Sequence, residues 1–265
     1  PRDGKRRNVA GAVLELAFPK GKDGMIPKLV VAGDCGLGGV ARAAEQLIRS
    51  TGQVVGLVAH DGATFDQQSL PFDDAKRHQL MKSLLFEQRL QMLVATTTMR
   101  RAVRKGLLLD NCEAVAILPP SADGDPKIFA QGLDLLVKAN RGRFVTWSDD
   151  TVIAKALQPV EPRRVILVAT CSDDKVAAAH IARGAPAVIP HWEASGPGFT
   201  LYDRGKPQFS TLLAPSDHTR RPLKPRELDD RVLAAALAYA SGLSVLSLEK
   251  ALNQPDPKAP EALSA

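Results

Sequence analysis

Apolar residues are distributed along the chain in two alternating patterns: short continuous runs, and stretches in which they recur with helical spacing. The run at 28–32 is followed by a glycine-rich turn at 33–39 and then by helical spacing. A second run at 53–60 ends at Asp61-Gly62, and we expect it to pair in parallel with the first strand. Strands separated by helices predict an α/β fold with a mostly parallel sheet covered on both faces.

The same alternation continues to residue 183. The segment 79–98 begins with helical spacing and ends with a strand-like run. Further strands are predicted at 114–120, 143–148 and 164–170. Further helices are predicted at 128–140, 151–157 and 174–183.

Beyond residue 185 the pattern changes. Short runs at 187–192, 199–205 and 208–215 are separated by glycine and proline, which predicts antiparallel strands at the edge of the sheet. A helix with acidic residues in its first turn is predicted at 227–241, and Gly242 fits its C-cap. A short last helix is expected from Ser247, and the proline-rich tail from Pro255 is expected to be mobile.

Length and composition favour one α/β domain. A chain of 265 residues with 45% hydrophobic residues can bury one substantial core. The three cysteines, Cys35, Cys112 and Cys171, show neither disulfide nor zinc-ligand spacing, which favours a reducing compartment. No apolar run approaches the roughly 18 to 20 residues of a membrane span, and the N-terminus has no signal-peptide core. The sequence therefore predicts a soluble, cytoplasmic protein without a membrane partner.

The net charge of +6 favours anionic partners in general. Basic residues gather at 5–7, 100–105 and 220–226, but aromatic residues are only 5% of the chain and do not alternate with these clusters. Surfaces that bind single-stranded nucleic acid combine basic and aromatic residues. We therefore interpret the clusters as solvated basic faces and expect no nucleic-acid partner.

Six stretches of the chain carry a resemblance to a known family. They are RNVA at 7–10, LELAFPKGKDGMIP at 14–27, TGQVVGLVAHDG at 51–62, RKGLLLDNCEAVAIL at 104–118, RFVTWSDD at 143–150 and DRVLAAALAYASGLSVLSLEKAL at 230–252. In wording and order they resemble the Mur-type amide ligases, and within them the Mur-like domain of cyanophycin synthetase. The resemblance covers nearly the whole chain.

The resemblance implies the three-layer central domain of a Mur ligase at 28–252, with a mostly parallel sheet, a phosphate loop and a small antiparallel edge sheet. It implies that 1–27 joins this domain to an ATP-grasp part, and that 253–265 is a flexible tail. In these ligases a second α/β domain follows the helix predicted here at 227–241 and closes over the substrate. This sequence stops soon after Leu252, so we expect the C-terminal Mur domain to be absent.

The glycine-rich turn departs from the family's phosphate loop. That loop has the form G-T-x-G-K-T: its backbone N–H groups cradle the phosphates, its lysine neutralises their oxygens, and its hydroxyl binds Mg²⁺. The matching residues, with the glycine that follows, are Gly33, Asp34, Cys35, Gly36, Leu37, Gly38 and Gly39. Leu37 replaces the lysine, Gly38 replaces the hydroxyl, and Asp34 adds a carboxylate. The resemblance therefore implies a degenerate phosphate loop.

Further family signatures also differ. The resemblance matches a metal-binding glutamate to Thr96, an Asn…Asp-His element to 119–124, and a lysine carbamylated in many of these ligases to Leu133. Asp149 and Asp150 stand where the family contacts the nucleotide, although an Asp-Asp pair after a strand also serves as a turn and a helix start. We therefore expect no catalytic residue, no metal site, and no binding of the family's cofactors, ATP and Mg²⁺.

These departures predict a degenerate, catalytically inactive Mur-like domain of the cyanophycin-synthetase type. In that type an ATP-grasp part and a Mur-like part elongate an aspartate polymer with arginine side groups, and one variant joins ready-made dipeptides with its ATP-grasp part alone. The resemblance implies such a dipeptide-polymerising variant or a paralogue. Its domain would serve as a scaffold, a homo-oligomer contact or a docking surface for a cyanophycin-like polymer, beside an ATP-grasp domain of the same or a partner chain. The alternative within the family is a functional ATP-dependent acid–amino acid ligase domain.

A dinucleotide-binding oxidoreductase is an alternative from another class. Gly36, Gly38 and Ala41 fit the pattern G-x-G-x-x-A after a strand, and Asp61 closes the next strand where a ribose-binding acid belongs. The acidic residues of two other candidate acid/base groups, Asp110 with Glu113 and Asp73-Asp74 with His78, are interpreted as surface charges. The remaining histidines show no ligand spacing; they are His60, His180, His191 and His218.

Overall fold

The computed structural model describes residues 26–107, 109, 112–194, 196–213 and 225–253. The strands are β1 (Lys28–Gly33), β2 (Val55–Val58), β3 (Ala63–Phe65), β4 (Gln68–Leu70), β5 (Met92–Thr98), β6 (Ala114–Ile117), β7 (Arg143–Trp147), β8 (Val165–Val168), β9 (Ala187–Glu193), β10 (Gly196–Asp203) and β11 (Lys206–Leu212). The helices are α2 (Leu37–Ser50), α3 (Arg77–Leu85), α4 (Met99–Lys105), α5 (Pro126–Ala139), α6 (Thr151–Leu157), α7 (Lys175–Ala182), α8 (Pro225–Ala240) and α9 (Val245–Leu252). Residues 1–25 of the predicted junction (1–27) and residues 254–265 of the predicted tail (253–265) lie outside the described residues.

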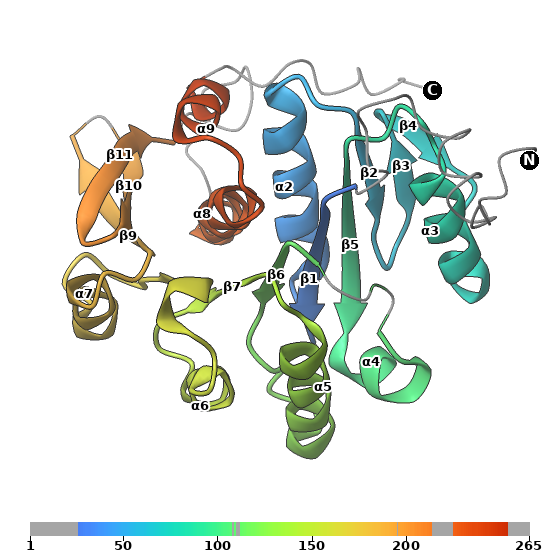
Figure 1. Cartoon of the computed structure of the whole chain (residues 1–265), viewed down its shortest axis with the longest axis horizontal. Helices are drawn as coiled ribbons and strands as arrows, with labels where there is room; N and C mark the ends of the chain where they lie inside the picture. The colour runs from blue at the N-terminus through green and yellow to red at the C-terminus, as the bar shows by residue number, and fades with distance from the viewer. Residues whose placement is uncertain (1–25, 108, 110–111, 195, 214–224, 254–265) are drawn as a thin grey trace, which may run out of the picture.

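The described strands form one 11-stranded sheet in the order β11-β10-β9-β8-β7-β6-β1-β5-β2-β3-β4 (Figure 1). Neighbouring strands from β9 through β2 in this order are parallel. Their carboxyl ends therefore meet at one edge of the sheet, which is where α/β folds bind ligands. The predicted α/β fold with a mostly parallel sheet is confirmed.

One predicted pairing is wrong. The second strand, β2, pairs in parallel with β5 and not with β1, because β5 lies between them. Residues 92–97 of β5 are all buried, and a strand buried on both faces belongs in the centre of a parallel sheet. Two apolar runs look alike locally, so the sequence pattern did not reveal which of them would lie next to β1.

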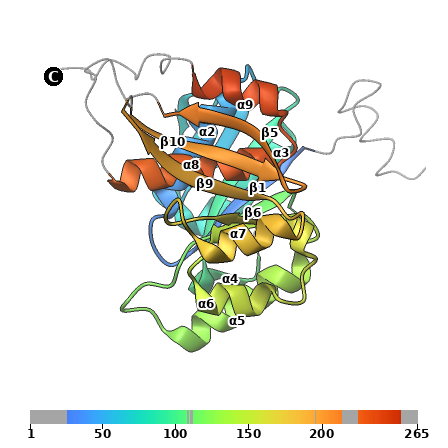
Figure 2. The ribbon, with the colours of Figure 1, turned by 90° about the vertical axis from the view of Figure 1, so that its left-hand side faces the viewer.

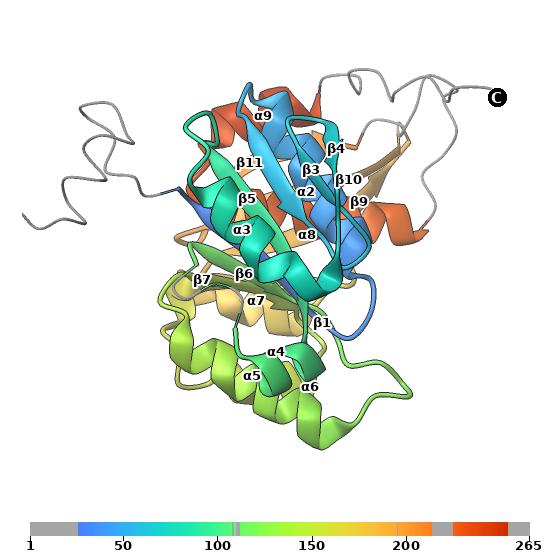
Figure 3. The same cartoon turned by 90° about the vertical axis from the view of Figure 1, so that its right-hand side faces the viewer.

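Alternate residues of the central strands face two helical layers. Leu29 and Val31 of β1 belong to a buried cluster with α2, α8 and α9, whereas Val30 and Ala32 belong to a second cluster with α4, α5 and α6. The two layers lie on opposite faces of the sheet (Figures 1 and 2). A third buried cluster joins α3 to β3 and β5 at the β4 end of the sheet (Figure 3). The predicted three-layer arrangement is confirmed.

The two edges of the sheet are antiparallel. β9, β10 and β11 form the predicted antiparallel edge, which continues the main sheet because β9 pairs in parallel with β8. At the other edge, β3 and β4 form a hairpin that the sequence analysis missed. Its turn residues, Asp66 and Gln67, have φ of 49° and 70°, the backbone of a type I′ turn. Such turns usually contain glycine, and its absence here removed the local signal.

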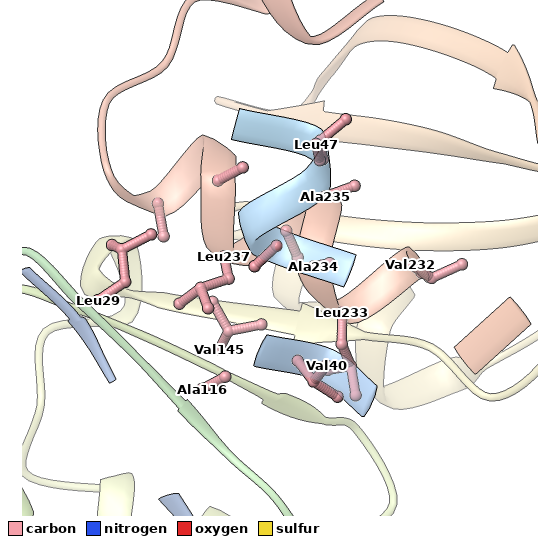
Figure 4. Close-up of a cluster of buried hydrophobic side chains, with 14 of the residues drawn as sticks. Leu29, Val40, Leu47, Ala116, Val145, Val232, Leu233, Ala234, Ala235 and Leu237 are labelled. Atoms are coloured by element: carbon pink, nitrogen blue, oxygen red, sulfur yellow. The ribbon is translucent and has the colours of Figure 1, made fainter. Parts of the chain in front are cut away.

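Helix α8 is an apolar helix in the interior of one layer. Residues 232–238 are all buried, so the helix contacts neighbours on every side. Val232, Leu233 and Leu237 are drawn with Val40 of α2 in Figure 4. The predicted end of this helix is confirmed, since Gly242 has φ of 94° and its N–H donates to the Tyr239 carbonyl at 3.0 Å. Within the described part of the chain, no helix is both long and apolar enough to cross a bilayer.

Candidate functional site

The turn between β1 and α2 lies at the carboxyl edge of the parallel strands. Helix α2 begins at Leu37, so Gly38 and Gly39 belong to its first turn and the loop is shorter than the predicted 33–39. Gly36 is the N-cap residue and has φ of 74°, a left-handed conformation that favours glycine. No side chain caps the helix at this residue. The first N–H groups of α2 therefore open toward this edge of the sheet.

The segment that follows β6 covers this loop closely. A Cβ atom on Gly33 would come within 2.8 Å of the Leu118 Cβ, so no larger residue fits there without movement. On the other side, Asp34 Oδ2 lies 2.9 Å from the Cβ position of Gly124. The 119–124 segment, which the resemblance matches to an Asn…Asp-His element, thus packs against the loop and against Asp34.

An acidic side chain from α8 lies at the N-terminus of α2. The carboxylate of Asp230 fills the space that a Cβ atom on Gly39 would take. Burial raises the pKa of Asp230 to about 6, an effect that the nearby Arg226 guanidinium partly offsets. Because helix N-termini attract anions, a carboxylate of the chain itself occupies a position suited to an external anion.

We expect Asp230→Asn to raise the free energy of unfolding by about 1 kcal/mol at pH 7.5. The pKa of Asp230 is higher in the folded chain than the ordinary value of 3.8, so ionisation between about pH 4 and pH 6 opposes folding. The group is only half-buried, and solvent screening reduces the effect well below that of a fully buried carboxyl. Urea unfolding of both proteins at pH 4 and pH 7.5 measures the difference.

Most of this gain should disappear at pH 4, where the carboxyl is protonated in the folded chain. Asp123→Asn, which changes an exposed carboxylate in the loop before α5, serves as the matched control and should show no gain. An equal gain for Asp230→Asn at both pH values would contradict the role assigned to its ionisation.

A guanidinium group from α2 lies beside the same loop. Arg42 Nη1 is 2.9 Å from the Cβ position of Gly38, and Arg42 Nη2 donates to Asp61 Oδ2 at 2.5 Å. That hydrogen bond is the main reason why the pKa of Asp61 is lowered. The imidazole of His60 also borders Gly38, at 3.3 Å from its Cβ position. The side chains of Arg42 and His60 therefore border the first turn of α2.

A second guanidinium group is buried at the carboxyl ends of β2 and β5. Arg77 is 2% exposed and donates to the Val58 carbonyl at 2.9 Å, to the Thr96 hydroxyl at 3.1 Å and to the Thr96 carbonyl. Burial lowers the pKa of Arg77 to about 10, so the group still carries its charge at neutral pH. Thr96 is the residue that the resemblance matches to the metal-binding glutamate, and a fixed cation lies against it.

Asp74 balances this buried charge. Its carboxylate accepts two hydrogen bonds from Arg101 Nη1, at 2.8 and 2.9 Å, and lies 3.8 Å from Arg77 Nη1. Its neighbour Asp73 caps the following turn by accepting from the N–H of Ala75. The candidate acid/base group formed by these acids and His78 is thus divided between an ion pair and a helix cap.

The two aspartates at the expected nucleotide contact have different surroundings. Asp150 caps α6 by accepting from the N–H of Ile153 at 2.9 Å. Asp149 is exposed and lines a cleft. The preceding Ser148 donates to Asp174, which in turn caps α7. Of the pair, Asp150 therefore has the structural role that the sequence left open, whereas Asp149 is exposed at the cleft.

The other candidate residues lie apart from the loop. Leu133 is buried in the cluster formed with α4, α5 and α6. His180 is buried against the Val165 carbonyl at 2.8 Å, and His191 lies 3.0 Å from the Ser210 hydroxyl. Among the described residues, no group of three or more His, Cys, Asp or Glu side chains is placed to hold a metal ion. Asp110 and His218 lie outside the described residues, and Glu113 accepts from the Lys28 N–H.

The sheet order bears on the dinucleotide interpretation. In dinucleotide-binding folds the first two strands of the βαβ unit are adjacent, and the second ends in the ribose-binding acid. In this chain β5 separates β1 from β2, and the carboxylate of Asp61 is paired with Arg42. The geometry therefore does not favour dinucleotide binding at this turn.

A cleft of about 550 Å³ opens at the carboxyl ends of β7, β8 and β9. The first turns of α8 form its other wall. The sequence analysis named two of its lining residues, Asp149 as a nucleotide contact and Pro119 in the 119–124 segment. It assigned no role to the other lining residues, which include Trp147, Thr170, Trp192, Asp229 and Val232. The only sequence signal for this cleft is the rarity of tryptophan, because the chain has two tryptophans and both line it.

No known family profile matches the chain. Cyanophycin synthetase of Synechocystis sp. is 30% identical over 123 residues, which are 46% of this chain and 14% of that protein. Cyanophycin synthetase of Geminocystis herdmanii is 21% identical over 277 aligned residues, which cover 98% of this chain and 30% of that protein. The chain thus spans less than a third of the length of these relatives.

Solved structures of amide ligases share the fold. A UDP-N-acetylmuramoyl-L-alanyl-D-glutamate–2,6-diaminopimelate ligase has a TM-score of 0.63 at 16% identity, covering 86% of this chain and 45% of its own. A bifunctional folylpolyglutamate synthase/dihydrofolate synthase, solved with Mn, AMPPNP and L-glutamate bound, has a TM-score of 0.53 at 12% identity, covering 86% of this chain and 57% of its own. Sequence relatives and fold together identify the chain as a Mur ligase-like domain related to the cyanophycin synthetases.

Proposed function

We propose that this domain has lost ATP-dependent ligation and has a structural role in a protein of the cyanophycin-synthetase type. The observation that carries the proposal is the presence of a guanidinium group at each of the two positions where the family holds its magnesium ion. Those positions, by resemblance, are Gly38 in α2 and Thr96 in β5. Arg42 borders the first and Arg77 contacts the second.

These two cations oppose a metal ion. A charge pair about 4 Å apart interacts by roughly 4 kcal/mol per unit charge at an effective dielectric constant of 20, and the interaction between a guanidinium and Mg²⁺ is repulsive. Arg77 is buried and held by three hydrogen bonds, so moving it away would break those bonds and expose a buried charge to an environment without its partners. The residues present therefore do not fit Mg²⁺.

The residues of the same loop also disfavour the binding of phosphate. The loop has Leu37 in place of the lysine, and Leu37 is buried in the core with α8 and α9. Asp34 and Asp230 place carboxylates beside the loop, where they repel phosphate oxygens. We infer that the chain keeps the Mur fold without its cofactors, ATP and Mg²⁺, and that no residue of this loop acts in catalysis.

The structural role rests on the relatives. Cyanophycin synthetases are much longer than the matched region, so a partner domain is consistent with them. We propose an ATP-grasp domain as that partner, with a homo-oligomer contact or a polymer-docking surface as the function of this domain.

Phosphate release tests the proposal. Incubated with ATP, Mg²⁺, aspartate and arginine, or with β-aspartyl-arginine dipeptide, the chain should release no more phosphate than a heat-denatured sample. Sedimentation should at the same time show association with itself or with an added ATP-grasp domain of a relative. Phosphate release that falls on Asp149→Lys, in a variant that remains folded, would show that the cleft is catalytic and would overturn the proposal.

A further inference from the structure

Three polar side chains lie together on the outer face of the antiparallel edge of the sheet, one each from β9, β10 and β11. Phe199 and Leu201 of β10 face the buried cluster formed with α2, α8 and α9, so Thr200 between them faces the other way. On that outer face His191 Nε2 lies 3.0 Å from Ser210 Oγ, and Thr200 Oγ1 donates to the same oxygen at 3.0 Å. A serine hydroxyl beside an imidazole is the pair from which serine nucleophiles are built.

A glycine in the middle strand makes the contact between His191 and Ser210 possible. These residues belong to strands that are not neighbours, because β10 lies between β9 and β11. Gly198 is paired with His191 in the β9–β10 ladder, and a Cβ atom on Gly198 would come within 2.6 Å of the imidazole. The ring thus lies over the position where any other residue would place its side chain. The imidazole reaches across β10 because residue 198 is glycine.

The hydrogen bonds of Ser210 indicate the direction of its proton. A hydroxyl donates one hydrogen bond and accepts up to two. Thr200 donates to Ser210 Oγ, which leaves the Ser210 proton for His191 Nε2, in the tautomer that carries its proton on Nδ1. Nδ1 is buried with no hydrogen-bond partner among the described residues, and it lies 3.6 Å from Glu193 Oε1, an ion-pair distance. This carboxylate would stabilise the imidazolium that forms when Nε2 takes the serine proton.

Ser210 is accessible, and its own backbone N–H lies at an open edge. The residue is exposed, and among the described strands β11 has a neighbour on one side only. Leu213 N–H donates to the Pro197 carbonyl, so residues 209, 211 and 213 direct their N–H groups to β10, and Ser210 directs its N–H to the open edge. The N–H of a nucleophilic serine can stabilise the negative oxygen that forms when the serine attacks a carbonyl carbon.

We propose that Ser210 is a nucleophile that accepts the acyl group of a small activated ester, with His191 as its general base. Ser210 Oγ forms a bond to the acyl carbon, the bond from that carbon to the leaving oxygen breaks, and the serine proton passes through His191 Nε2 to the leaving alcohol. Because the face is open and one N–H serves the negative oxygen, we expect reaction only with esters that have a good leaving group. This inference goes beyond the proposed function, since it requires no ATP and no partner domain.

Covalent labelling tests this assignment. The intact chain, without ATP, is treated with a small alkyl fluorophosphonate: Ser210 Oγ bonds to phosphorus, the P–F bond breaks, and the serine proton leaves with fluoride. Peptide mass spectrometry should find the adduct at Ser210, forming at least tenfold faster than at Ser83, an exposed serine whose hydroxyl donates to the Leu80 carbonyl. With p-nitrophenyl acetate as the reagent, the acetyl group should appear on the same serine.

Variants assign the reactivity to this group of side chains. Ser210→Ala should lose the adduct at this position. His191→Gln should slow the labelling of Ser210 at least tenfold, because a positioned general base typically contributes about 10²–10⁴ in rate. Thr200→Val keeps a β-branched side chain of similar shape on β10 and should slow labelling less than His191→Gln does. Ser83→Ala is the matched control and should leave the rate at Ser210 unchanged.

Three results would overturn the inference: no adduct at Ser210, equal rates of labelling at Ser210 and Ser83, or an unchanged rate at Ser210 in folded His191→Gln. Circular dichroism of each variant excludes unfolding as the cause. Because no ATP is present, none of these results bears on the proposed function, and phosphate release by the chain would refute that proposal alone.

Discussion

Replacing Arg77 with methionine is expected to lower the free energy of unfolding by about 3 kcal/mol. The guanidinium is 2% exposed and donates to the carbonyls of Val58 and Thr96. Methionine fills similar volume but removes the donor to both carbonyls, and a lost hydrogen bond to a charged group costs about 1.5 to 3 kcal/mol. Relief of the desolvated charge offsets part of this loss. Urea unfolding at pH 7 measures the difference.

Arg100→Met is the matched control, because Arg100 lies on the exposed face of the neighbouring helix α4. Its free energy of unfolding should change by less than about 0.5 kcal/mol. Arg77→Lys should fall between the two, since a single ammonium cannot reproduce the planar fork. A loss below about 1 kcal/mol for Arg77→Met would show that the buried guanidinium does not hold the ends of β2 and β5 together.

The second large effect expected is the loss of tight ATP binding. Calorimetric titration with ATP and Mg²⁺ is expected to show no binding tighter than about 1 mM, a standard free energy of roughly 4 kcal/mol. The reason is the combination of Leu37 and Gly38 in the loop with guanidinium groups at both metal positions. A micromolar Kd would contradict the proposed loss of ATP binding.

Restoring the family's loop residues alone should not restore binding. In Leu37→Lys with Gly38→Thr, the new threonine Cβ would come within 2.9 Å of Arg42 Nη1, and the lysine would start from a buried position. Adding Arg42→Ala removes that contact, so the triple variant should bind ATP with Mg²⁺ more tightly than the double variant. Equal affinities would show that Arg42 does not obstruct the metal position.

Local signals predicted much of the fold. The helix C-cap at Gly242 and the capping role of Asp150 depend on residues within one turn, and the structure bears out both. The parallel strands and the antiparallel edge at β9–β11 follow from periodicity, which is also local. The β3–β4 hairpin was missed because its turn lacks the glycine by which such turns are recognised.

The contacts around the loop were not predictable in the same way. Arg77 contacts Thr96 across nineteen residues, and Arg42 reaches Asp61 across the same separation. Asp230 meets Gly39 from a helix near the other end of the chain. Each contact depends on which strand lies beside which. The pairing of β2 with β5, where the sequence analysis expected β2 beside β1, brings together Val58 and Thr96, to which Arg77 donates.

The sequence by itself determined the α/β class, the order of the elements, the glycines of the first turn and the resemblance to Mur ligases, because these depend on local periodicity and on residue identity. Only the tertiary structure decided that β5 separates β1 from β2, that guanidinium groups border Gly38 and Thr96, and that both tryptophans share a cleft with Asp149 and Asp229. Those features arise where distant segments meet at the carboxyl edge of the sheet, and burial and charge there depend on the neighbours that the packed sheet supplies.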